Sequence, residues 1–171
     1  MEITIRRATE KDISGVIACL TEAFQEYRES YTVDAFDDTV PTIEGMERRS
    51  KEMKILIAED KSSRIIGTVS YRVCSRSEGH LRGMAVLPRF QGKGSAKRLL
   101  EAVETELKQL GCSRITLDTT LPLQRATRFY LKHGFKPTGI TRDFFGMPVF
   151  EYEKVLKRGE FTQKGRDGEY E

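Results

Sequence analysis

A glycine-containing basic turn at residues 91–96 carries the clearest chemical signal in this chain of 171 residues. The turn consists of Gln91, Gly92, Lys93, Gly94, Ser95 and Ala96. The pattern that follows predicts an amphipathic helix that stops at Gly111 and has apolar residues at Ala96, Leu99, Leu100, Val103, Leu107 and Leu110. The first N–H groups of a helix lack partners within it, and the helix dipole adds positive charge there. The sequence therefore predicts an anion site suited to phosphate groups.

The spacing of the glycines excludes two common phosphate-binding motifs. A nucleotide P-loop has the pattern G-x-x-x-x-G-K-[ST], whereas here Lys93 precedes Gly94 and no glycine occupies the upstream position. A dinucleotide-binding turn has the pattern G-x-G-x-x-G, and Lys97 stands where its third glycine would be. The turn must therefore belong to another class of phosphate site.

Two segments together resemble the GNAT-type N-acetyltransferase family. Gln91, Gly94 and Ala96 match its acetyl-CoA-binding motif [RQ]-x-x-G-x-[GA]. Residues 125–135 are similar to the family's A-x-x-F-Y-x-x-x-G-F helix, and between the two segments residues 114–119 alternate like a strand. The resemblance covers residues 3–156, and its strong motifs lie between residues 80 and 135. It implies acetyl-CoA as the donor, a primary amine as the acceptor and no metal.

The resemblance also implies roles for the segment that precedes the turn. Backbone groups of Met84, Ala85 and Val86 are expected to pair with the pantetheine arm of acetyl-CoA and to hold the oxyanion of the thioester. The residues of the turn, 91–96, are expected to bind the pyrophosphate. Gly83 fits a bulge or a close approach of ligand to backbone, and the other interpretation is a glycine that makes room for packing.

Tyr130 and His80 are the candidate catalytic residues. In the family, the tyrosine of the second motif protonates the departing thiolate, which assigns that role to Tyr130; without the motif, helical spacing would favour a core tyrosine. By the two-residue period of a strand, His80 shares one face with Glu78 and Arg82, and its imidazole suits a general base. A water chain is the alternative base. A metal-free transfer through a ternary complex follows, and the alternative function is an acyl-CoA sensor without turnover.

The elements that must position these residues predict a mixed α/β domain. A capping box at residues 9–12 opens a helix that reaches about residue 28, and a polar, acidic segment leads from there to a second helix at residues 42–53. Strands are predicted at residues 3–5, 54–59, 65–73, 78–86, 114–119, 138–142 and 149–156. The resemblance implies a largely antiparallel sheet of six to seven strands flanked by about four helices.

The acceptor is the least specified part of the sequence. In this fold the acceptor groove lies between the first helices and the last strand pair. Three aspartates there, Asp34, Asp37 and Asp38, would attract a cationic amine, whereas the alternative is a solvated acidic segment. Many family members have an asparagine where this chain has Leu123, so one cofactor contact is expected to be absent or replaced.

Composition and length predict one soluble domain, residues 1–156, with a polar tail at residues 157–171 expected to be disordered. A net charge of +3 with 32% charged residues argues against nucleic acid as a partner. No apolar run has the length of a signal peptide or a membrane span, so we expect a cytoplasmic protein without a membrane partner. Cys19, Cys74 and Cys112 suggest neither disulfides nor a zinc site. The resemblance also allows a homodimer, which no residue here specifies.

Overall fold

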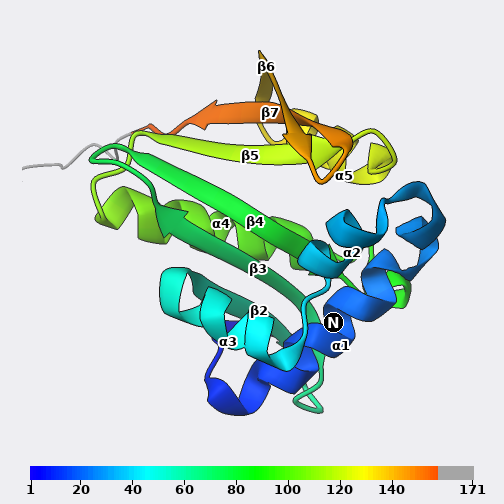
Figure 1. The fold of residues 1–171 in the computed structure, drawn as a ribbon. Helices are drawn as coiled ribbons and strands as arrows, with labels where there is room; N and C mark the ends of the chain where they lie inside the picture. Colours follow the sequence, from blue (N-terminus) through cyan, green and yellow to red (C-terminus); the bar gives the residue numbers. More distant parts are fainter. Residues whose placement is uncertain (158–171) are drawn as a thin grey trace, which may run out of the picture.

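The computed structural model describes residues 1–157, which form a seven-stranded sheet with helices on both of its faces (Figure 1). The α-helices are α1 (Ile13–Phe24), α2 (Val33–Thr39), α3 (Ile43–Glu52), α4 (Ser95–Gln109) and α5 (Gln124–Lys132). The strands are β1 (Ile3–Arg7), β2 (Lys54–Asp60), β3 (Ile65–Val73), β4 (Glu78–Val86), β5 (Arg114–Thr120), β6 (Lys136–Phe144) and β7 (Met147–Val155). Their order in the sheet is β1-β2-β3-β4-β5-β7-β6, and β4 with β5 is the parallel pair among antiparallel neighbours. The predicted mixed fold is confirmed.

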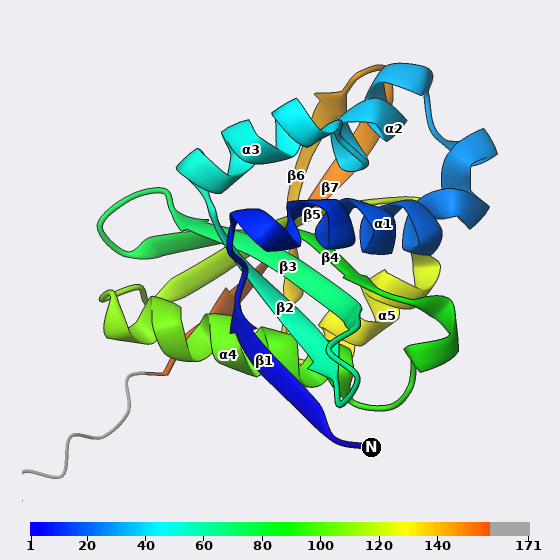
Figure 2. The same cartoon turned by 90° about the horizontal axis from the view of Figure 1, so that it is seen from below.

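Helices lie on both faces of the sheet, as the view from below shows (Figure 2), and two apolar layers hold them there. On one face, Val16 and Leu20 of α1 and Met46 of α3 pack with Ile57 of β2. On the other face, the apolar stripe predicted for residues 96–110 buries Leu99, Leu100, Val103 and Leu107 of α4 against the middle of the sheet. Leu110, which was predicted to belong to this stripe, is 48% exposed because α4 has already ended.

The segment after α1 differs from its predicted form. The capping box is present, since the Asp12 carboxylate accepts from the Thr9 N–H at 2.7 Å, but α1 ends at Phe24 and a 3-10 helix, Gln25–Ser30, replaces its last turn. The acidic segment that was expected to lack a helix contains α2. Thr32 caps α2 by accepting from the Ala35 N–H at 3.2 Å, and Ala35 is fully buried. The low helix propensity of this acidic segment gave the wrong prediction, because the Thr32 cap and the burial of Ala35 stabilise the helix more than the aspartates destabilise it.

The contact between Gly79 of β4 and Leu107 of α4 gives the first testable prediction. A Cβ at residue 79 would lie 2.5 Å from a methyl carbon of Leu107, which is fully buried. Gly79→Ala should therefore destabilise the protein by about 1–3 kcal/mol, and Leu107→Ala by about 2–5 kcal/mol. In the double variant the added methyl partly fills the space left by leucine, so urea unfolding should give a loss smaller than the sum. Additive losses would show that the two positions do not compete for the same space.

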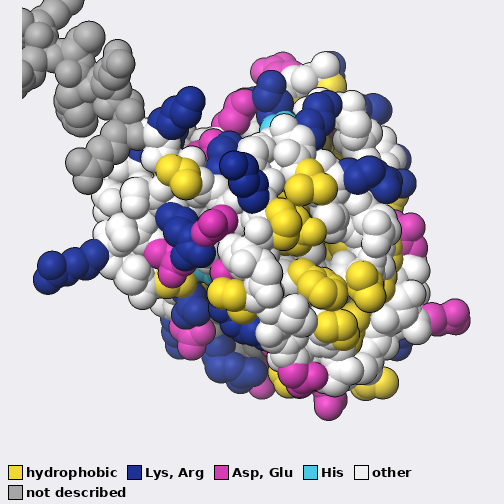
Figure 3. All heavy atoms as spheres, turned by 90° about the horizontal axis from the view of Figure 1, so that it is seen from above, with side chains coloured by type: hydrophobic (Ala, Val, Ile, Leu, Met, Phe, Trp, Pro, Cys, Tyr) yellow, Lys and Arg dark blue, Asp and Glu magenta, His cyan; other side chains and the backbone are white. Residues whose placement is uncertain are grey.

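The described surface carries charges of both signs. In the view from above, Lys and Arg side chains are interspersed with Asp and Glu, and hydrophobic side chains gather on one part of the face (Figure 3). Within residues 1–157, no helix has the length and apolar character needed to cross a bilayer. The tail predicted to be disordered falls at residues 158–171 outside the described part of the chain.

Candidate active site

A cavity opens in the sheet where β4 and β5 separate. The two strands pair only at their beginnings, from Glu78 opposite Arg114 to His80 opposite Thr116. Beyond this point they diverge toward the side on which α2 lies (Figure 1). Because β3 pairs only with the other edge of β4, the edge that faces β5 has no strand partner after His80. Its backbone groups are therefore available to a ligand.

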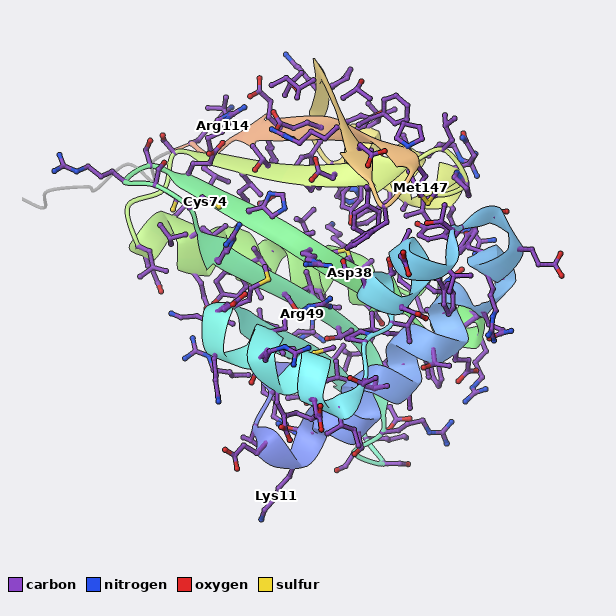
Figure 4. All side chains as sticks on the ribbon, viewed as in Figure 1. Lys11, Asp38, Arg49, Cys74, Arg114 and Met147 are labelled. Atoms are coloured by element: carbon purple, nitrogen blue, oxygen red, sulfur yellow. The ribbon has the colours of Figure 1, made fainter. Side chains whose placement is uncertain are left out.

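Ion pairs close the opposite, paired end of β4 and β5. Arg114 of β5, labelled in Figure 4, contacts the carboxylates of Glu78 on β4 and Glu153 on β7. Its guanidinium also lies 3.5 Å from Glu151. Three strands are thus joined at one end, and the separation is confined to the other.

The cavity has a volume of about 780 Å³ and is lined from both faces of the sheet. Residues 80–86 of β4 and 118–120 of β5 form its walls. On one side it is lined by the turn at residues 91–96, α4 and α5, and on the other by α1, the following 3-10 helix, α3 and the β6–β7 hairpin, and these two sides are called its mouths below. This arrangement suits two ligands that meet in the middle.

The predicted phosphate-binding turn leads directly into α4. Gly92 and Gly94 have φ angles of 75° and 92°, which side chains rarely adopt, so glycine is required there by conformation. Gly94 is the N-cap of α4, and the hydroxyl of Ser95 is buried with no hydrogen-bond partner in residues 1–157. All residues of the turn line the cavity except Lys93, whose ammonium lies 5.6 Å from the centre of the Phe90 ring. Free N–H groups and an unsatisfied hydroxyl therefore meet at one mouth.

Gln91 connects the turn to both neighbouring elements. Its amide donates to the Val86 carbonyl at 3.1 Å, and its carbonyl accepts from Arg125 of α5. The Val86 carbonyl, expected to pair with pantetheine, therefore already has one partner within the chain. Leu123, which stands in place of the family asparagine, is partly buried and lines the cavity.

Tyr130 belongs both to the core and to the cavity wall. It is the one buried residue of α5, 6% exposed, and its ring lies 5.5 Å from the rings of Phe129 and Phe135. Burial raises the pKa of Tyr130 above the ordinary value for a phenol, so the hydroxyl is protonated at neutral pH. The structure thus places a protonated Tyr130 hydroxyl in a largely apolar setting.

His80 lies where the two strands begin to diverge. Its Nδ1 is 2.9 Å from the Thr116 hydroxyl on β5, and its side chain lines the cavity. Burial lowers the pKa of His80, and the neighbouring Arg72 and Arg82 act in the same direction against Asp118 and Glu78. The imidazole is therefore neutral at neutral pH. If Nδ1 donates its proton to Thr116, Nε2 carries the free lone pair.

The strand bulges at Gly83, which settles one question left open by the sequence. The register between β3 and β4 shifts between Thr68 and Ser70, opposite Gly83, and Gly83 has a φ of 63°. A Cβ at residue 83 would have only the Arg49 guanidinium within 4 Å, so crowding does not require glycine. The bulge interpretation is therefore confirmed over the packing interpretation.

The second mouth contains residues that sequence reasoning missed. They are Tyr27, Tyr31, Thr39, Arg49 and Val149. The Tyr31 hydroxyl bonds the Thr120 hydroxyl at 2.7 Å across 89 positions of sequence, which no local pattern reveals. The sequence could have pointed to Arg49. It lies three residues after Met46 on the buried stripe of α3, where a charged residue is unexpected.

The three aspartates lie outside the cavity. Asp34 and Asp37 are exposed on α2, and none of the three is among the residues that line the cavity within the described chain. The Asp38 carboxylate forms an ion pair with Arg82 of β4. The charged residues that line this mouth are Arg49, Arg82 and Asp118, and the Asp118 carboxylate lies 3.4 Å from the Arg142 guanidinium.

Separated parallel strands, a glycine turn at a helix start and a buried tyrosine together define an acyl-CoA-dependent transferase fold and site. Residues 19–135 match the acetyltransferase (GNAT) family, so the chain belongs to that family. It is 26% identical over 142 residues to an amino-acid acetyltransferase of Pseudomonas putida, with 81% of this chain and 28% of the relative covered. It is 23% identical over 143 residues to an aminoalkylphosphonate N-acetyltransferase of Salmonella typhimurium, with 77% and 84% covered. The chain thus spans about a quarter of the first relative and most of the second.

A solved structure shares the architecture. The PaiA N-acetyltransferase of Thermoplasma acidophilum, in complex with coenzyme A, superimposes with a TM-score of 0.75 at 22% identity. The match covers 91% of this chain and 99% of that one. This similarity establishes the fold.

Proposed function

We propose that this protein transfers the acetyl group of acetyl-CoA directly to a primary amine, with both substrates bound in one ternary complex. The observation that carries the proposal is the cavity between β4 and β5, which is lined by residues from both faces of the sheet. Such a cavity suits a direct transfer, because a thioester and an amine bound on its two sides would meet between the strands. The first mouth would take the donor and the second the acceptor.

The donor mouth fits acetyl-CoA on the chemistry of its own residues. The N–H groups at the start of α4 and the unpartnered Ser95 hydroxyl would hold the pyrophosphate, aided by the helix dipole. The unpaired edge of β4 at Met84 would hold a pantetheine amide, while Val86 would contribute its N–H. The register pairs the backbone groups of Ala85 with Thr68 of β3, so Ala85 would contribute through its side chain, which lines the cavity. Bound there, acetyl-CoA supplies an activated acyl group, and the protein needs no metal for the step.

The proposed reaction forms one N–C bond and breaks one C–S bond, while the amine loses a proton and the thiolate gains one. Tyr130 would donate that proton, because burial keeps its hydroxyl protonated and the residue lines the cavity. A backbone N–H at the Gly83 bulge would stabilise the developing oxyanion. The proton returns to Tyr130 from solvent or from the base.

Removal of the amine proton is the second requirement. An alkylamine has a pKa of about 10.4, so at neutral pH only roughly one molecule in a thousand is the free base. Neutral His80 can accept this proton directly or through water. A strand rises about 3.3 Å per residue, so His80 lies roughly 13 Å along the chain from Met84, which favours a relay through water.

The His80→Gln variant tests whether His80 or water alone removes the amine proton. If His80 is the base, kcat of the protein falls as the pH drops through the pKa of His80, which lies below the ordinary imidazole value. The variant should lose this acidic limb and retain about a tenth of kcat. His133→Gln provides the control, since this second histidine also lines the cavity but its Nδ1 donates to the Phe129 carbonyl of the preceding helix at 2.8 Å. An unchanged acidic limb in His80→Gln would assign the base to water alone.

The transferase itself is tested by CoA release from acetyl-CoA across a panel of amino acids, aminophosphonates, polyamines, aminoglycosides and peptides. Calorimetric binding of acetyl-CoA is measured in parallel. Acceptor-dependent release supports the proposal, and the relatives that act on amino acids and aminoalkylphosphonates by name favour a small-molecule amine. Binding without release for every amine would favour an acyl-CoA sensor instead.

A further inference from the structure

Arg49 is a buried charge without a carboxylate partner. Its side chain is on the sheet side of α3, and the residue is only 8% exposed. Within residues 1–157, its one side-chain hydrogen bond runs from Nη2 to the backbone carbonyl of Asp38, at 2.8 Å. Figure 4 shows Arg49 and Asp38 together over the β3–β4 part of the sheet. Four of the five guanidinium donors are thus left for another group.

The charge of Arg49 persists despite its burial. Burial and, to a smaller extent, the nearby Arg82 lower the pKa of Arg49 to about 10, while Asp38 opposes the shift. The guanidinium is therefore protonated at neutral pH. Burying an unpaired charge is expensive, so such groups in proteins are normally paired with an ion of opposite sign.

The neighbouring charges do not supply this partner. Arg82 also lines the cavity, and it is this second arginine that forms the ion pair with the Asp38 carboxylate. Asp118 of β5 also lines the cavity, but its carboxylate pairs with Arg142 at 3.4 Å. The Arg49 and Arg82 guanidinium groups and the Asp38 carboxylate therefore leave a net charge of +1 beside the cavity. An incoming anion would balance it.

The position of Arg49 relates this charge to the proposed chemistry. Its Nη1 lies 3.5 Å from the point that a Cβ of residue 83 would occupy, directly over the bulge of β4. The bulge immediately precedes Met84, where the acetyl group is expected. Arg49 comes from α3, on the face opposite the phosphate-binding turn and α4. It therefore belongs to the acceptor mouth and lies beside the point of transfer.

We propose that Arg49 and Arg82 form an anion subsite, and that the acceptor is a small primary amine with a carboxylate or phosphonate a few atoms from its nitrogen. This inference rests on the proposed acetyltransferase function and specifies its substrate. A planar guanidinium binds either anion through two parallel hydrogen bonds, which fixes the acceptor in one orientation. The amine is then held at a constant distance from the bulge.

Matched acceptors test the subsite directly. Alanine is compared with alaninamide, and 2-aminoethylphosphonate with 2-aminoethanol, by the rate of CoA release. We expect kcat/KM to be at least about tenfold higher for the anionic member of one pair. The pair that shows this preference identifies whether the subsite binds a carboxylate or a phosphonate. A nearby anion raises the pKa of the amine and so reduces its free-base fraction, and basicity therefore cannot explain such a preference. Equal rates within both pairs would overturn the inference.

Variants connect the preference to the arginines. Arg49→Met should raise KM for the anionic acceptor at least about tenfold and leave KM for its neutral counterpart within about twofold. Arg48→Met is the matched control, because Arg48 is the adjacent, exposed arginine of α3 and does not line the cavity. An undiminished preference in a folded Arg49→Met protein would refute the role of Arg49.

Asp38→Asn gives an independent test if Arg49→Met does not fold. The substitution removes the carboxylate that competes for Arg82 and keeps the backbone carbonyl that accepts from Arg49. KM for the anionic acceptor should therefore fall. A rise in KM would instead indicate that Asp38 attracts the cationic amine, and this result would contradict the subsite.

Calorimetry distinguishes failure of the subsite from failure of the transferase. If no amine in the panel releases CoA, the CoA-loaded protein is titrated with alanine, alaninamide and 2-aminoethylphosphonate. Binding of an anionic compound but not of alaninamide, lost in Arg49→Met, would support the subsite even though the transferase proposal had failed. Binding of none of them, or of alaninamide equally, would overturn the subsite.

Discussion

Tyr130→Phe is expected to lower kcat by about 100-fold while the Kd of acetyl-CoA changes by less than about twofold. Phenylalanine keeps the ring that packs between Phe129 and Phe135, so the variant loses only the hydroxyl. Without that proton donor the thiolate must leave unprotonated from an apolar cavity. Steady-state kinetics and calorimetric titration with acetyl-CoA measure the two effects separately.

Tyr152→Phe is the control for this experiment. Tyr152 of β7 packs against the same core but does not line the cavity, so its substitution should leave kcat unchanged. The pH dependence of kcat adds a second readout. Because the pKa of Tyr130 is raised, its hydroxyl stays protonated throughout the neutral range, and kcat should not fall there through loss of this proton. Full kcat in a folded Tyr130→Phe protein would show that the thiolate obtains its proton elsewhere.

Gly94→Val is expected to weaken acetyl-CoA binding by up to about 30-fold. A valine held at a φ of 92° carries a conformational strain of about 1–2 kcal/mol. We expect the backbone of the turn to rotate to relieve this strain, which would move its N–H groups away from the positions that would hold phosphate. Calorimetric titration with acetyl-CoA measures the loss. Acceptor preference should not change, since Gly94 lies at the donor mouth.

Gly111→Val separates the loss of binding from the loss of stability. Gly111 follows the opposite end of α4 and has a φ of 87°. At Gly111, as at Gly94, an added Cβ would meet no other atom within 4 Å. Both variants should lower the midpoint of thermal unfolding by a similar amount. Only Gly94→Val should weaken acetyl-CoA binding, and an equal loss in Gly111→Val would attribute the effect to general destabilisation.

Elements with strong hydrophobic periodicity were predicted well from the sequence. The apolar stripe of α4, the alternation of β5 and the β2–β3 hairpin all depend on residues close together in the chain. The prediction was wrong for α2, because Thr32 and the buried Ala35 stabilise a helix whose other residues do not favour one. Periodicity could not detect a helix of seven residues.

The two halves of the candidate site differed in how far they could be predicted. The donor half lies within two short segments, residues 80–96 and 125–135, so spacing and motif indicated its members. The acceptor half combines α1, the following 3-10 helix, α3, β6 and β7, which are distant in sequence. Arg49 was missed for this reason, and the aspartates were given a role in the cavity that their positions do not support.

The sequence by itself determined the fold class, the family and the phosphate-binding turn, because glycine conformation, helix starts and apolar periods are local properties of the chain. Only the tertiary structure decided where β4 separates from β5 and that Arg82 forms an ion pair with Asp38. It also decided that Arg49 is buried beside the bulge without a carboxylate partner. These outcomes depend on which distant groups meet, and on whether solvent or protein surrounds a charge once they do.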